Sequence, residues 1–297
     1  RGYPRPFVLG LLAAGGTLGI LIPPSIPMIV YGFITEESVI ALFLAGVGPG
    51  LVLIALFCAY AMLYARLSGA YQPSPKAAGA ERRRATLRAL PSIALAAVIV
   101  GGIYAGIFTP TEASAIGVVV ALVITVAVLR TLAWRGFVDA VYQAMVTTVT
   151  ILLIVAGAKV FGKAITLYRL PQDLSQLIVS TFTEPFMFIV VVALVLVLMG
   201  LVLEALSMML IMVPVLAPSL LPLGIDPIWF GVFFVIMVEC ALITPPVGLN
   251  LYVIQAVSRS RMGEVARGVW PFLALMLMTV GLIYVFPGVA LYLPFHF

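Results

Sequence analysis

The chain has 297 residues, of which 64% are hydrophobic and only 9% are charged, and its net charge is +5. Its mean hydropathy is +1.24. A soluble domain carries charge on about a quarter of its residues, so this composition excludes one and predicts a polytopic membrane protein. Continuous apolar runs such as 189–203 favour helices over alternating barrel strands. The expected fold class is therefore all-α.

The chain opens with a predicted broken helix at 7–31, followed by a predicted span at 38–67. Residues 68–90 are polar, and the positive-inside rule makes them a cytoplasmic loop. We interpret the loop as a topology determinant. A nucleic-acid site is excluded there, because no folded domain presents the basic residues. These residues are Lys76, Arg82, Arg83, Arg84 and Arg88.

The rest of the chain is expected to form a second repeat over 91–297. Its predicted elements are spans at 91–108 and 113–129, a long helix at 136–166, a re-entrant hairpin at 186–221, a broken helix at 227–257 and a last span at 269–293. A hairpin must return to the side that it left. The broken helix at 227–257, which follows the hairpin, is therefore expected to run from outside to inside, whereas the one at 7–31 runs from inside to outside. The two broken helices would then be related as an inverted repeat.

Two proline pairs interrupt long apolar segments, at Pro23-Pro24 and Pro245-Pro246. Proline removes a backbone donor and blocks the preceding helical turn, so each pair is expected to unwind its helix. At membrane depth such a break persists only where protein or a water-filled cavity covers it. A shift of 222 positions superposes the pairs, which indicates an internal repeat.

The breaks are the strongest candidate sites, because unwound carbonyls can ligate a small cation or face an anionic substrate. Ser25, Thr244 and Asn250 would add side-chain oxygens. The alternative is that the prolines merely bend helices for packing. Glu204 and Glu239 are carboxylates at membrane depth, and each is either a cation or proton ligand or a structural partner.

Catalytic signatures are missing from the sequence. The single histidine is His296, and no metal-ligand cluster, Gly-flanked nucleophilic serine or Gly-rich nucleotide loop is present. We therefore expect no enzyme activity and no cofactor. An ion gradient would supply the driving energy.

Three motifs carry a family resemblance: Ile22-Pro23-Pro24-Ser25-Ile26-Pro27, Thr109-Pro110-Thr111-Glu112, and Thr244-Pro245-Pro246-Val247-Gly248-Leu249-Asn250. The chain resembles the large membrane (permease) subunit of tripartite ATP-independent periplasmic (TRAP) transporters of the dicarboxylate type. The likeness covers essentially the whole chain. It implies an elevator-type, multi-pass protein of the bacterial inner membrane that imports small organic acids, such as C4-dicarboxylates, with sodium.

The resemblance also implies partners and site residues. The partners are a small membrane subunit and a periplasmic substrate-binding protein. One sodium site would join the hairpin tip to the second break, and the other would use the first break. Carried onto this sequence, the former would use the tip at 200–207 with Thr244, Pro245 and Gly248, and the latter would use the break at 22–27. With Glu239 and Asn250, which the residues themselves suggest beside the second break, the candidate ligands at that site are Gly200, Glu204, Ser207, Glu239, Thr244, Pro245, Gly248 and Asn250. At the first break they are Ile22, Pro23 and Ser25.

Compared with the family pattern, the first repeat is incomplete. The first hairpin and the scaffold helices before it would precede Arg1, so the chain looks truncated at its N-terminus. Two other functions remain open from the sequence: a proton- or sodium-coupled anion carrier that needs no binding protein, and a non-transporting remnant or scaffold subunit.

Overall fold

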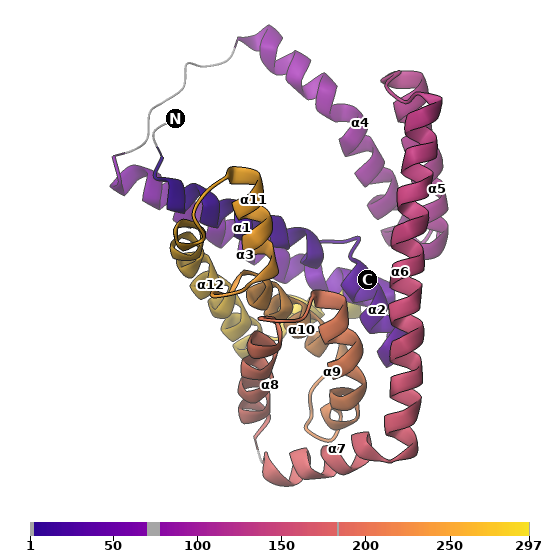
Figure 1. Cartoon of the computed structure of the whole chain (residues 1–297), viewed down its shortest axis with the longest axis vertical. Coiled ribbons are helices and arrows are strands. Elements are labelled where there is room, and N and C mark those ends of the chain that lie inside the picture. The colour runs from indigo at the N-terminus through magenta and orange to yellow at the C-terminus, as the bar shows by residue number, and fades with distance from the viewer. Residues whose placement is uncertain (1–2, 70–77, 183, 297) are drawn as a thin grey trace. The chain divides into compact units, whose positions relative to one another are not determined.

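The computed structural model describes residues 3–69, 78–182 and 184–296, and all regular elements there are helices (Figure 1). This confirms the all-α class. The helices are α1 Arg5–Leu21, α2 Ile26–Thr35, α3 Val39–Leu67, α4 Gly79–Tyr104, α5 Pro110–Val123, η1 Ile124–Val128, α6 Trp134–Leu167, α7 Leu170–Thr181, α8 Pro185–Met199, α9 Ala205–Leu220, α10 Pro227–Ile243, α11 Leu249–Ser258, α12 Met262–Val285 and α13 Gly288–His296.

Several helices are long and apolar enough to cross a membrane. Among the described residues five single helices meet this condition, namely α3, α4, α5 continued by η1, α6 and α12. The bent pair α1 and α2 adds a sixth if it counts as one span. The chain is therefore a multi-pass membrane protein.

Polar caps and prolines fix where many of these helices begin. Side-chain oxygens of Ser25, Ser38, Thr109 and Asp226 accept a backbone N–H of the first turn, at distances from 2.9 to 3.4 Å. Such caps satisfy donors that a helix start leaves free. At Thr109 the Glu112 carboxylate reciprocates, which makes a capping box.

The chain divides into two compact units, and each is described by itself. The first comprises residues 1–72 and 158–297, and the second comprises residues 73–157. In the second unit α4 packs on α5, and the ring of Phe108 covers Gly102. Most side chains of its helices are exposed, and almost none of the apolar spanning surface is buried within the chain.

The first unit is built around α10. Every residue from 228 to 243 is buried, because α1, α2, α3, α8, α9, α11, α12 and α13 all pack on this helix. At its start, the hydroxyl of Tyr31 on α2 donates to the Pro227 carbonyl at 2.6 Å. In the nearby turn between α2 and α3, burial and the Asp226 carboxylate raise the pKa of Glu37.

Close backbone crossings hold the other helices of this unit together. Gly10 of α1 and Gly268 of α12 meet without side chains, so a Cβ on either would overlap backbone of the facing helix. Beside the crossing, the ring of Phe7 stacks on Tyr64 with centroids 4.2 Å apart, and Phe272 meets Tyr60 edge-on at 5.2 Å.

The two broken helices have matching bounds. Helices α1 and α10 both have 17 residues, and their first and last residues each differ by 222 positions. Helices α2 and α11 follow them with 10 residues each. The structure thus gives both segments the same plan, as the proposed sequence repeat requires. Their direction across a membrane stays a prediction.

Some predicted boundaries are wrong. Residues 79–90 belong to α4 rather than to a loop, because Ala, Arg and Leu are good helix formers and no proline interrupts them before Pro91. The expected loop residues 70–77, with Lys76, lie outside the described residues. The last span was expected at 269–293, but α12 begins at Met262 and ends before Pro287, and α13 is separate.

The crossing of α1 and α12 generates a stability prediction. Gly268→Ala places a methyl group against the Pro6 carbonyl, so we expect it to lower the free energy of unfolding by about 1–3 kcal/mol. The matched control is Gly281→Ala on the same helix, where a Cβ meets nothing within 4 Å. This change should be neutral or stabilising by about 1 kcal/mol at most. Thermal unfolding in detergent compares the two, and equal midpoints would contradict the close crossing.

Candidate functional site

The second break lies between α10 and α11. Helix α10 ends at Ile243, and α11 begins only at Leu249. Thr244 closes α10, since its amide donates to the Ala241 carbonyl at 3.2 Å and its Oγ1 donates to the Cys240 carbonyl at 2.6 Å. The two following prolines have no N–H with which to continue the helix.

This break leaves carbonyl oxygens free. The carbonyls of residues 242–247 accept no hydrogen bond from the described part of the chain. Gly248 has a φ of 33°. A Cβ built on it would lie 3.0 Å from both the Leu242 and the Thr244 oxygen. Glycine at this position therefore lets the loop fold back onto two unpaired carbonyls.

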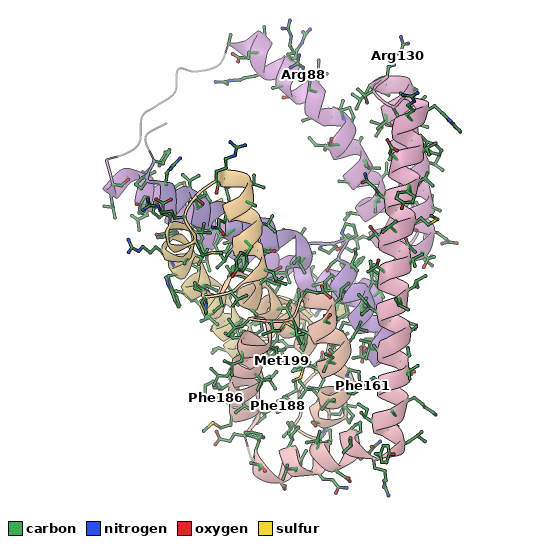
Figure 2. All side chains as sticks on the ribbon, viewed as in Figure 1. Arg88, Arg130, Phe161, Phe186, Phe188 and Met199 are labelled. Atoms are coloured by element: carbon green, nitrogen blue, oxygen red, sulfur yellow. The ribbon has the colours of Figure 1, made fainter. Side chains whose placement is uncertain are left out.

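The hairpin of α8 and α9 lies against this break. Both arms pack on α10. At the tip between them, Gly200 is so close to Ala241 that a Cβ on Gly200 would overlap the alanine. Figure 2 marks Met199 at the tip end of α8, with Phe186 and Phe188 toward its other end. The predicted tip and the predicted break are therefore neighbours.

Glu204 and Ser207 come together at the start of α9. Glu204 is the N-cap residue: its Oε2 accepts from the Leu206 amide at 3.1 Å, and its Oε1 accepts from the Ser207 amide at 2.9 Å. The Ser207 hydroxyl also donates to Oε1, at 3.0 Å. In this structure Glu204 is thus a structural partner that orders the tip, and a carboxylate retains acceptor capacity beyond these bonds.

The first break joins α1 to α2 at an angle of 41°. The Ser25 hydroxyl donates to the Ile20 carbonyl and accepts from the Met28 amide. The carbonyls of residues 22–24 accept no hydrogen bond from described residues. Behind the break, α3 brings Gly46 against the Leu21 carbonyl. In both breaks the Pro–Pro peptide bond is cis.

Glu239 lies on α10 but faces the first break. It is fully buried, and its carboxylate faces the backbone of Leu21 at the end of α1. Neither oxygen has a hydrogen-bond partner among the described residues. Burying a carboxyl group without a hydrogen-bond partner costs folding free energy. Glu239 differs in this respect from Glu204, whose oxygens both accept hydrogen bonds.

The structure therefore sorts the predicted ligands into two groups. Gly200 at the tip lies against Ala241, three residues before Thr244, and Glu204 and Ser207 bond each other at the start of α9. Glu239 instead lies beside Leu21, next to the break of Ile22, Pro23 and Ser25. Asn250 is half-buried in the first turn of α11. The described residues contain no group of three or more His, Cys, Asp or Glu side chains that would hold a metal.

Sequence reasoning missed several residues that build these sites. Ala241 supports the tip, and Leu242 supplies one of the carbonyls that face Gly248. Leu21 and Gly46 frame the first break. These residues act through the backbone or through small size, so their side chains gave no chemical signal. The only indication in the sequence was a small residue, Ala241, shortly before the second proline pair.

The cap at α9 generates a prediction that needs no ion. Glu204→Ala removes the acceptor of two backbone donors, so we expect a loss of about 1 kcal/mol in sodium-free buffer, measured by thermal unfolding. Glu184→Ala is the control, because Glu184 is the N-cap of α8 without a side-chain cap bond. Equal midpoints for wild type and Glu204→Ala would show that the cap contributes nothing.

Comparisons with known proteins agree with this architecture. The family model of the tripartite ATP-independent periplasmic transporter, DctM component, matches residues 1–289. The C4-dicarboxylate TRAP transporter large permease protein DctM of Pseudomonas aeruginosa is 37% identical over 293 residues, which cover 99% of this chain and 68% of that protein.

Two further relatives have other substrates in their names. The sialic acid TRAP transporter large permease protein SiaM of Vibrio cholerae is 35% identical, with 98% of this chain and 68% of that protein covered. The ectoine/5-hydroxyectoine permease protein UehC of Ruegeria pomeroyi is 34% identical, with the same coverage of both chains. These relatives are transporter permeases, which confirms that the chain is not an enzyme. The chain belongs to the DctM family, the large permease proteins of TRAP transporters.

Proposed function

We propose that this chain imports a small organic acid, such as a C4-dicarboxylate or a similar carboxylate, with a sodium gradient as the energy source. The family is described as ATP-independent and periplasmic, which supports an energy source other than ATP and a location in the bacterial inner membrane, facing the periplasm. The named substrates of the relatives are small organic molecules, two of them described as acids.

The observation that carries this proposal is the second break with the hairpin tip against it. Several carbonyl oxygens there lack partners, and the Thr244 hydroxyl keeps lone pairs because it donates to Cys240. A hard cation is held by oxygen atoms of this kind, and transporters form such sites at interrupted helices. Sodium at this point would join the tip to the broken helix.

A second sodium site is proposed at the first break, where the carbonyls of Ile22 and Pro23 are unpaired and the Ser25 hydroxyl, which donates to Ile20 and accepts from Met28, keeps one lone pair. The buried carboxyl group of Glu239 faces the residue just before them. Because α10 packs on both the hairpin and the first broken helix, these parts are suited to move together in an elevator cycle.

Two partners complete the proposed transporter. The word tripartite in the family description supports two further components. They are a small membrane subunit and a periplasmic protein that binds the acid and delivers it to the permease. The permease would then supply the ion sites and the translocation pathway, and the binding protein would contribute to substrate specificity.

Proteoliposomes test this function. The permease is reconstituted with its small membrane subunit, and uptake of labelled succinate is measured with and without an inward sodium gradient and with and without added binding protein. We expect uptake to require both. Uptake without a sodium gradient would refute sodium coupling, and uptake without the binding protein would refute its role in delivery. Replacing the sodium gradient by a proton gradient tests the alternative coupling ion.

At the proposed sodium site, Thr244→Ala removes one oxygen ligand. We expect the sodium concentration for half-maximal uptake to rise about tenfold while the amount of folded protein stays the same. Thr279→Ala is the matched control, since the Thr279 hydroxyl on α12 makes the same kind of bond, to the Leu275 carbonyl at 3.0 Å, and is not among the proposed ligands.

Pro245→Ala tests the same site through the backbone. It returns an N–H to the break, which can then pair one of the free carbonyls and weaken sodium dependence. Pro271→Ala within α12 is its control. Unchanged sodium kinetics in both Thr244→Ala and Pro245→Ala would move the sodium site away from this break.

A further inference from the structure

The first ten residues of α4 hold a dense group of positive charges. Arg82, Arg83, Arg84 and Arg88, here called the arginine collar, are all exposed. Figure 2 labels Arg88 among them. The only acid in the first turn is Glu81. The collar lies directly before the apolar part of a helix that is long and apolar enough to span the membrane.

The protein does not neutralise these charges within its described residues. The one side-chain hydrogen bond in this stretch runs from the Thr86 hydroxyl to the Arg82 carbonyl, at 3.1 Å, and involves no guanidinium group. Arg84 and Arg88 are four residues apart on one face, where like charges repel. Cations near the start of a helix also oppose its dipole. An anion from outside the chain would relieve both effects.

A hollow beside the collar has the composition that such an anion requires. It has a volume of about 480 Å³ and is lined by Gly79, Ala80, Arg83, Arg84 and Leu87. Two adjacent guanidinium groups offer planar forks that match the oxygens of a phosphate. Leu87 adds an apolar wall, which a free inorganic ion would not use.

The helix continues from this hollow with an apolar stripe. Arg83, Leu87 and Leu90 are spaced by four and three residues, so they lie on one face. Leu87 is 56% exposed and Leu90 is 53% exposed. A phosphate-binding end followed by an exposed leucine stripe, which leads toward the membrane-spanning part, matches the shape of a phospholipid: a charged headgroup and an acyl chain.

We propose that the arginine collar binds the headgroup of an anionic phospholipid, with Arg83 and Arg84 on the phosphate and an acyl chain along Leu87 and Leu90. Clusters of basic residues next to a membrane span attract anionic lipid in general. The structure adds a defined hollow and a direction for the lipid tail. This inference concerns the second unit alone and does not depend on the ion that drives transport.

Lipid titration of the purified protein in neutral detergent tests this site. Phosphatidylglycerol is added to wild type, to the double variant Arg83→Gln and Arg84→Gln, and to the control double variant Arg130→Gln and Arg135→Gln, which removes two exposed arginines outside α4. Thermal unfolding and native mass spectrometry report stabilisation and bound lipid. We expect phosphatidylglycerol to stabilise wild type and the control, and to bind the collar variant about tenfold more weakly.

Three results would overturn the proposal. Phosphatidylcholine could stabilise wild type as well as phosphatidylglycerol does, the collar variant could retain full lipid binding, or inorganic phosphate could reproduce the whole effect. High salt should weaken the binding, since the arginines are exposed and their charges are screened. The substituted arginines are all exposed, so the three proteins should unfold at the same temperature without lipid. A lower midpoint without lipid would identify a folding defect and separate it from a loss of lipid binding.

Discussion

Everything in the first unit depends on the requirement that backbone polar groups inside a membrane have partners. The two proline pairs break this requirement, because a proline cannot donate to the carbonyl one turn earlier. Around each pair the chain supplies protein on several sides: the hairpin tip at one, and α3 with α10 at the other. The unpaired carbonyls thus lie beside packed protein and keep their lone pairs, while Ile22, Pro24 and Pro246 stay exposed within the chain.

The buried helix α10 explains how one chain keeps two such breaks in order. Eight helices pack on it, and every residue from 228 to 243 is buried. Close approaches that only small residues permit, such as Gly200 on Ala241 and Gly10 on Gly268, set the distances. The chemistry of the sites therefore rests on packing as much as on the oxygens themselves.

Much of this was readable from the sequence. The apolar composition gave the fold class, and the spacing of the proline pairs predicted both breaks and their repeat, since proline has a direct effect on the backbone. The apolar arms around Gly200 and Glu204 predicted two helices joined by a turn, which are α8 and α9, while their re-entrant course in a membrane stays a prediction. Residues 79–90 are helical although their high charge density predicts a loop, because arginine is a good helix former.

The pairing of the site residues could not be read from the sequence. Which carboxyl group lies at which break depends on helix packing over long distances in the chain, and no local pattern records it. Glu204 caps its own helix, which its spacing to Ser207 could have indicated. Glu239 faces Leu21, more than two hundred positions earlier, which no spacing indicates.

This last contact has a mechanical consequence. Helix α10 ends in one break while the carboxyl group on its penultimate turn faces the helix that ends in the other. A helix that contacts both breaks couples them, because a tilt that moves the backbone at one break also moves the backbone at the other. Under the proposed function, the two sodium sites would therefore fill and empty together.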